Sequence, residues 1–140
     1  MKSVQADSKA LFRDFVETVV NDLEARAVDD VFAEDALLKG AGASYRGAGE
    51  IKEFVRALET AFPDFTFEIE DLLSEGHKVA AHVTVTGTHE GEFQGIPPTG
   101  REFSYPAVII ATVEDGAIAE MVYESDRVGL MKQLGVMNGH

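Results

Sequence analysis

Cysteine is missing from this 140-residue sequence, and Lys and Arg are fewer than half as many as Asp and Glu, 12 against 25, for a formal net charge of −13. Without cysteine there can be no disulfide, no thiolate metal ligand and no cysteine nucleophile. The excess of negative charge repels phosphate backbones and anionic lipid surfaces. The sequence therefore predicts neither a nucleic-acid partner nor a membrane partner.

Long apolar runs are missing as well, since no stretch approaches the ~18 apolar residues that a membrane-spanning helix needs. The first residues, Met-Lys-Ser-Val-Gln-Ala-Asp, lack the apolar segment of a signal peptide, so a cytoplasmic location is expected. The histidines and carboxylates show no metal-ligand spacing such as His-Glu-x-x-His, and no metal is expected. The length is sufficient for a real core, and residues 1–140 are predicted to form one domain.

The hydrophobic pattern changes from helical to strand-like along the chain. Apolar residues at intervals of three and four predict helices over residues 7–27, 28–32 and 50–62. After Pro63 the pattern alternates, which predicts strands over residues 65–70, 79–89, 103–113 and 117–125, with a shorter strand over 36–39. Glu114-Asp115-Gly116 is a hairpin signal, and the glycine-rich segments 40–49 and 90–101 are predicted loops.

Helices that precede hairpin-connected strands are typical of an α+β fold. We expect a curved antiparallel or mixed sheet wrapped around the N-terminal helices. Long strands with bulges curve, and helices on the concave side would leave a pocket at the open end. The pattern thus predicts a curved sheet with an internal pocket at its open end.

Several segments resemble a known family when they are taken together. They are Phe-Pro-Asp-Phe-Thr-Phe at 62–67, the Gly- and Pro-rich stretch from Gly87 to Arg101, Glu-Asp-Gly-Ala-Ile-Ala-Glu at 114–120, and Asp126 followed by Gln-Leu-Gly at 133–135. In this order and spacing they resemble the SnoaL-like polyketide cyclase family over nearly the whole chain. The resemblance implies the cone fold of the nuclear transport factor two-like superfamily.

The resemblance also implies an activity: ring closure by intramolecular aldol condensation, without a metal or an organic cofactor. It places Asp126 at the family's catalytic acid/base position. The sequence departs from the family at two places. Met121 and Val122 stand where a His-Trp pair is common, and Thr112 lies where an arginine is common.

Asp126 has two interpretations. As a general base it would take a proton from a carbon next to a carbonyl, which requires an apolar site, because a solvated aspartate with a pKa of about 3.9 is too weak a base. As a helix N-cap it would begin a tail helix over residues 127–134, since aspartate is a preferred cap. The family match favours the cavity carboxylate, and the two roles are compatible.

Other side chains have a functional and a structural interpretation each. His89 is a candidate proton donor or shuttle, or a strand-end histidine that orients the following loop. Arg101 can bind an acidic substrate group or brace its own loop. Tyr105 and Tyr123 can donate phenol hydrogens to a developing oxyanion, or simply pack with their hydroxyls at the surface. The predicted cavity walls are Val83, Val85, Val108, Ile110, Val122, Phe54, Phe62 and Phe67.

The sequence is compatible with three classes of function. The first is a cofactor-independent cyclase, isomerase or lyase that acts on a small hydrophobic carbonyl compound, with Asp126 as acid/base. The second is a cavity that binds a small apolar ligand without chemistry. The third is a module that forms a homodimer through the outer face of its sheet. Epoxide hydrolysis needs an arginine between two carboxylates inside the cavity, and no arginine lies in the middle of a predicted strand.

Overall fold

The computed structural model describes residues 4–40 and 42–136, and it confirms the α+β cone. The helical part consists of α1 (Val4–Asp14), a π-helical segment η1 (Phe15–Asn21), a 3₁₀ turn η2 (Ala25–Ala27), α2 (Val28–Val31) and α3 (Gly47–Ala61). A mixed sheet contains β1 (Phe32–Gly40), β2 (Ala43–Arg46), β3 (Thr66–Glu75), β4 (Lys78–Thr88), β5 (Glu102–Glu114) and β6 (Ala117–Ser125). Helix α4 (Arg127–Leu134) follows the last strand.

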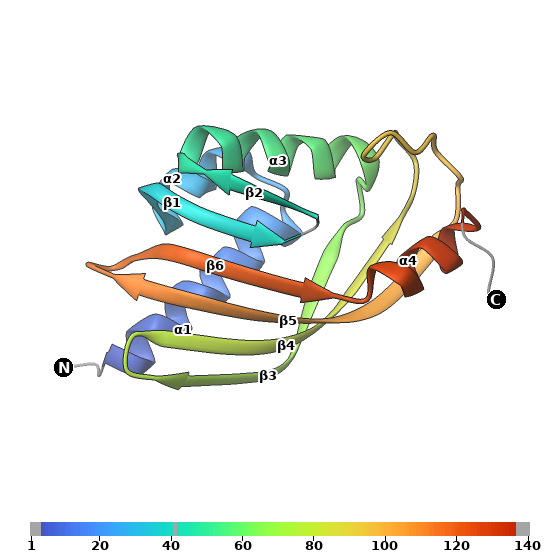
Figure 1. Ribbon diagram of the computed structural model, residues 1–140. Helices are drawn as coiled ribbons and strands as arrows, with labels where there is room; N and C mark the ends of the chain where they lie inside the picture. Colours follow the sequence, from blue (N-terminus) through green and yellow to red (C-terminus); the bar gives the residue numbers. More distant parts are fainter. Residues whose placement is uncertain (1–3, 41, 137–140) are drawn as a thin grey trace.

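The strand order in the sheet is β2-β1-β6-β5-β4-β3, so the last strand lies next to the first. β1 pairs with β6 in parallel, and every other neighbouring pair is antiparallel. Figure 1 shows the curved sheet with α1 and α3 against its inner side. The interior between the helices and this side of the sheet contains the core.

Strand alternation fixes which side chains point inward. Along β5 the odd-numbered residues from Phe103 to Val113 are buried, and the even-numbered ones are largely exposed. Val108 and Ile110 are therefore on the outer face, with 47% and 44% of their surface exposed. Their predicted place on the cavity wall is wrong. Val83 and Val85 of β4 are buried, but they are not among the residues that line the cavity described below.

β6 contains a β-bulge that changes its alternation. Ile118 pairs with Val113, but the next pair joins Glu120 to Thr112, so Ala119 is an extra residue. An extra residue moves all the following side chains to the opposite face. After the bulge the inward positions are Met121, Tyr123 and Ser125, all of which line the cavity described below.

Several predicted boundaries differ from the structure: β1 begins at Phe32 rather than at residue 36, and β3 continues to Glu75 rather than ending at residue 70. The segment 40–49, expected to be a loop, instead contains β2 and the start of α3. Gly47 makes this abrupt change possible, because its φ of +88° favours glycine. The helix expected over 7–27 becomes π-helical after Asp14 and ends at Asn21, whose side-chain amide and carbonyl bond both backbone groups of Phe67.

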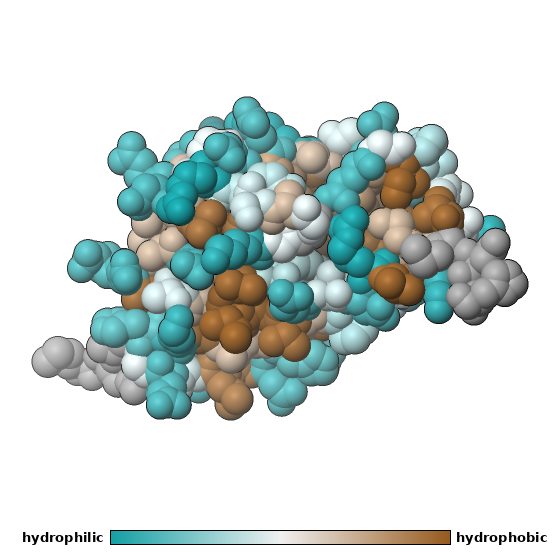
Figure 2. All heavy atoms as spheres, in the orientation of Figure 1, coloured by the Kyte–Doolittle hydropathy of each residue, from teal (hydrophilic) through white to brown (hydrophobic). Residues whose placement is uncertain are grey.

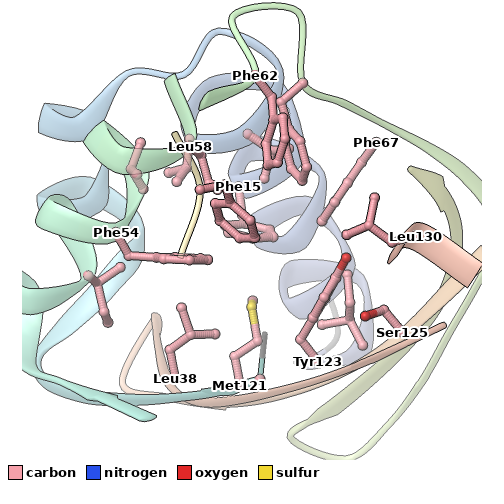
Figure 3. A pocket seen from close by; sticks show the side chains of 18 of the residues that line it. Phe15, Leu38, Phe54, Leu58, Phe62, Phe67, Met121, Tyr123, Ser125 and Leu130 are labelled. Atoms are coloured by element: carbon pink, nitrogen blue, oxygen red, sulfur yellow. The ribbon is translucent and has the colours of Figure 1, made fainter. Parts of the chain in front are cut away.

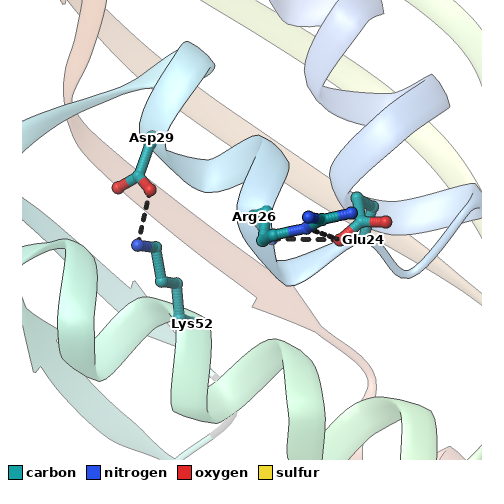
Figure 4. Close-up of polar contacts among 4 residues, drawn as sticks. All are labelled: Glu24, Arg26, Asp29 and Lys52. Atoms are coloured by element: carbon teal, nitrogen blue, oxygen red, sulfur yellow. Dashed lines mark hydrogen bonds and ion pairs between the residues drawn. The ribbon is translucent and has the colours of Figure 1, made fainter.

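Two surface ion pairs connect residues of the helical part of the structure. Lys52 of α3 pairs with Asp29 of α2, and Arg26 pairs with Glu24 at the start of η2 (Figure 4). All four side chains are partly in solvent, where an ion pair contributes about 0–1 kcal/mol. These pairs therefore fix local geometry, while apolar burial provides most of the stability. None of the helices in the described residues is long and apolar enough to cross a membrane.

Candidate ligand cavity

An apolar cavity lies between the helices and the inner face of the sheet (Figure 3). Its volume is about 80 Å³, several times the ~10–15 Å³ that one water molecule needs. A fused-ring ligand would therefore have to extend through the mouth or displace lining side chains. The lining residues are Phe15, Val19, Val20, Phe32, Leu38, Gly40, Ile51, Phe54, Val55, Leu58, Phe62, Phe65, Phe67, Phe93, Tyr105, Ile109, Met121, Tyr123, Ser125, Arg127 and Leu130.

The helical walls of the cavity come from one α-helix and one π-helical segment. Helix α3 presents Ile51, Val55 and Leu58, spaced by four and three residues, to the interior. The π-helical segment η1 contributes Phe15 and Val19 among others. π-helical turns recur at functional sites, which fits a role for this cavity beyond packing.

Three phenylalanines predicted for the walls do line the cavity: Phe54, Phe62 and Phe67. Phe67 stacks on Tyr123 with ring centroids 6.0 Å apart and planes within 4°. Phe54 stacks on Tyr45 at 4.6 Å. These contacts give the cavity rigid aromatic walls that suit a flat apolar ligand. Their contact with a substrate stays a prediction.

The polar end of the cavity is formed by two tyrosines. The hydroxyls of Tyr105 and Tyr123 are 3.1 Å apart and share a hydrogen bond, and Ser125 also bonds the Tyr123 hydroxyl. Figure 3 shows the hydroxyls of Tyr123 and Ser125 at the cavity surface. Burial raises the pKa of both phenols above the usual value, so both stay protonated at physiological pH. They are therefore hydrogen-bond donors rather than bases.

Asp126 lies outside the cavity. Its side chain is exposed, and the carboxylate accepts a 2.8 Å hydrogen bond from the Gly129 N–H as the N-cap of α4. The expected burial of this carboxylate in an apolar cavity is wrong, and the cap interpretation is correct. Asp126 nevertheless stands between two residues that line the cavity, Ser125 and Arg127, so its backbone is at the rim.

His89 is buried but is not among the cavity-lining residues. Its Nδ1 accepts a hydrogen bond from the Thr99 N–H at 3.3 Å, and its backbone bonds Gly100 and Arg101. The ring packs beside Phe62, and its Nε2 has no hydrogen-bond partner among the described residues. This geometry matches the structural interpretation, in which the histidine holds the two ends of the 90–101 loop together.

Two further predicted substrate contacts also lie elsewhere. Val122 follows the bulge in β6 and pairs with Ile110 on the outer face of the sheet. Unbroken alternation from Ile118 would place Val122 on the inner face, but the bulge at Ala119 reverses the faces. Arg101 is exposed, and its guanidinium lies beside Gly135 at the end of α4 rather than at the cavity.

Sequence reasoning missed two polar cavity residues, Ser125 and Arg127. Arg127 is half-buried at the start of α4, and its guanidinium donates a 2.8 Å hydrogen bond to the side-chain oxygen of Gln94. Both residues flank Asp126 in the sequence. Unbroken alternation from Ile118 would place Ser125 on the outer face, and the bulge at Ala119 that reverses it has no signature in the local sequence.

Metal coordination has no geometric support within residues 4–40 and 42–136, where no group of three or more His, Asp or Glu side chains could hold an ion. The polar groups at the cavity are phenols, one hydroxyl and one guanidinium. Such a set favours binding of oxygen atoms on a ligand through hydrogen bonds.

Comparison with known proteins assigns the fold to a family. The family model described as SnoaL-like polyketide cyclase matches residues 10–134. No curated protein matches the sequence. Among solved structures, TsrD from Streptomyces laurentii is 29% identical with a TM-score of 0.85, and the match covers 94% of this chain and 97% of that one.

Two other solved structures are similar over almost their entire length. IdmH from Streptomyces antibioticus, described as a candidate polyketide cyclase, is 29% identical with a TM-score of 0.77 and coverage of 92% and 99% of the two chains. A candidate SnoaL-like polyketide cyclase from Jannaschia sp. CCS1 has a TM-score of 0.88 at 19% identity, with 99% and 98% covered, which shows the fold alone.

Proposed function

Because the chain belongs to the SnoaL-like polyketide cyclase family, we propose that it is a cofactor-independent enzyme that binds a hydrophobic carbonyl compound in the cavity. The reaction would be an intramolecular aldol condensation or a related isomerase or lyase step. The observation that carries this proposal is that the cavity has apolar aromatic walls and, at one end, a hydroxyl cluster formed by Tyr105, Tyr123 and Ser125.

The hydroxyl cluster can supply the hydrogen-bond donor that such a reaction requires at the carbonyl oxygen of the substrate. When a proton leaves the carbon next to a carbonyl, negative charge develops on the carbonyl oxygen. The phenols of Tyr105 and Tyr123 remain protonated, so one of them can donate a hydrogen bond to that oxygen while it also accepts from the other. A donor in a site that excludes water stabilises such charge far better than a donor in water.

Asp126 is the proposed general acid/base, acting from the rim. In the structure its side chain is exposed to water. A ligand that covers the rim would remove that water, and a carboxylate that loses water becomes a stronger base. The proposal therefore requires the ligand to extend from the cavity over the start of α4.

The test compares two amide substitutions. After a thermal-shift screen of polyketide-like and steroid-like carbonyl compounds has found a substrate, Asp126→Asn should lower kcat about a hundredfold or more, because general acid–base catalysis contributes at least that much. Asparagine is as good an N-cap as aspartate, so folding should be unaffected. Glu124→Gln is the matched control, an exposed carboxylate two residues earlier, and should retain full activity.

A binding protein without chemistry is the second candidate. It is favoured by the exposure of Asp126 and by the lack of any carboxylate among the described cavity-lining residues. In this case Asp126→Asn would leave ligand affinity intact, and no turnover would be found with the wild-type protein. Equal kcat in the wild type and Asp126→Asn would instead rule out Asp126 as the base.

We further propose that the outer sheet face forms a homodimer. Leu73, Ala80, Ile110 and Val122 are in register across β3, β4, β5 and β6, and Figure 2 shows apolar side chains gathered over these strands. Leu73 and Ile110 are 67% and 44% exposed. A continuous apolar row on one face suits a two-fold contact with a second copy of itself.

A further inference from the structure

The cavity has an unbalanced charge at its polar end. Among the described residues that line it, Arg127 carries a charge and no side chain carries the opposite one. None of the ion pairs found within residues 4–40 and 42–136 includes Arg127.

The guanidinium is held in place by a neutral group instead. Its Nη2 donates to the side-chain oxygen of Gln94 at 2.8 Å. The Gln94 backbone has a φ of +49°, a conformation that costs a non-glycine residue about 1 kcal/mol or more. An amide orients the arginine but cannot neutralise it, so the positive charge remains available to a bound molecule.

The charge of Arg127 affects the tyrosines at the polar end of the cavity. Its charge lowers the pKa values of Tyr105 and Tyr123, although burial, the larger effect, raises them. The guanidinium and both phenols line the same cavity. A guanidinium has five hydrogen-bond donors and no acceptor, and the phenols are protonated, so this end of the cavity is rich in donors.

We propose that the natural ligand carries a carboxylate, which Arg127 binds at the cavity mouth while the apolar body of the ligand lies among the phenylalanines. A carboxylate fits because its planar pair of oxygens matches the fork of one guanidinium. A phosphate dianion would usually require more than one cation. This inference rests on the proposed role of the cavity as the ligand site, and it specifies the class of ligand as an amphipathic acid.

The test uses a matched pair of probes, 1-naphthylacetic acid and its methyl ester, titrated at pH 7 by calorimetry. Both have the same apolar body, and only the acid is charged. The acid should bind about tenfold more tightly than the ester. This is the lower end of the range for a hydrogen bond to a charged group, because Arg127 is only partly buried. Amide chemical-shift changes at Leu38 and Ser125 would locate the probe in the cavity.

Variants separate the arginine from general electrostatics. Arg127→Met should remove the preference for the acid and leave ester affinity within about twofold, whereas Arg127→Lys should keep part of the preference. Lys132→Met is the control: it removes the same charge from an exposed position on α4, away from the cavity, and should retain the full preference.

A second variant tests the charge without removing the arginine. Gln94→Glu is nearly isosteric and places a carboxylate against the Arg127 guanidinium. The internal carboxylate should then compete with the ligand, so the preference for the acid should fall towards unity. Melting temperatures of all variants should stay within a few degrees of the wild type.

The outcomes distinguish this inference from the proposed function. Equal affinities of the acid and the ester, or an undiminished acid preference in Arg127→Met, would overturn the carboxylate assignment and leave the carbonyl chemistry intact. An acid preference without any Asp126-dependent turnover would support the assignment and count against the enzyme. Binding of neither probe would contradict both, because an apolar ligand site is common to them.

Discussion

The Asp126 carboxylate accepts a hydrogen bond from the Gly129 N–H, and this 2.8 Å contact begins α4. Removal of the carboxylate by Asp126→Ala should lower the free energy of unfolding by about 1 kcal/mol, the usual cost of losing an N-cap. Asp126→Asn should lower the free energy of unfolding by only a few tenths of about 1 kcal/mol, because asparagine is also a good N-cap. Urea denaturation of both variants checks this, and equal losses would show that the charge rather than the cap stabilises the helix.

Gly129 should tolerate alanine poorly, in contrast to most helical glycines. An alanine in place of glycine usually stabilises a helix interior by about 1 kcal/mol. Here a Cβ on Gly129 would lie 2.2 Å from Oδ2 of Asp126, so the carboxylate would have to leave its capping position. We expect Gly129→Ala to be neutral or destabilising. The same substitution in the Asp126→Ala background should recover the normal gain, and failure to recover it would exclude this clash as the cause.

The tyrosine pair should behave as one unit. Tyr105→Phe and Tyr123→Phe each remove one hydroxyl from the 3.1 Å hydrogen bond, which should cost about 0.5–1.5 kcal/mol in each case. The double variant should cost less than the sum of the two, because the bond can be lost only once. Additive losses in the chemical-denaturation cycle would mean that the two hydroxyls do not depend on each other.

Alkaline pH should unfold the protein through its tyrosines. Burial raises the pKa values of Tyr45, Tyr105 and Tyr123 above the unfolded value of about 10. The folded state then binds these protons more tightly than the unfolded state. Their contribution to stability is complete below about pH 10 and is lost as the pH rises above it.

This prediction can be followed by the ultraviolet absorbance of phenolate. In urea all three tyrosines should ionise together near pH 10, whereas in the native protein phenolate should appear only at higher pH, together with loss of helical circular dichroism. Native titration of all three at about pH 10 without unfolding would contradict the raised values.

The outer sheet face should determine the oligomeric state. Ile110→Lys places a charge in the centre of the apolar row, and should shift a dimer to a monomer in sedimentation equilibrium. Val128→Lys is the control, since Val128 is 53% exposed on α4 and outside the row. A wild-type protein that is monomeric at all concentrations would contradict the proposal.

The sequence predicted the fold well because its strongest signals were long and regular. Helix α3 and strands β4 and β5 each show an uninterrupted period, and their existence follows from it. The cavity was harder to predict, because one extra residue at Ala119 reverses the faces of β6. That reversal put Val122 outside and Tyr123 and Ser125 inside, and no local pattern announces it.

Asp126 shows a different limit of prediction. Its two interpretations, cap and cavity acid, need the same residue at the same place in the chain, so only the direction of the side chain can separate them. The position of Arg127 likewise depends on how α4 leaves the strand and on its contact with Gln94, thirty-three positions away. Long-range contacts of this kind have no periodic signature.

The position of β6 between β1 and β5 has a consequence for synthesis on the ribosome. β1 can pair with its parallel neighbour β6 only after β2, β3, β4 and β5 have been translated, because β6 follows them in the chain. Until then the nascent polypeptide exposes the unpaired edges of β1 and β5 and the apolar side chains of its interior. A prematurely terminated product that lacks β6 would keep these edges and its apolar interior exposed. It would therefore be prone to aggregate and would be bound by chaperones or degraded by proteases.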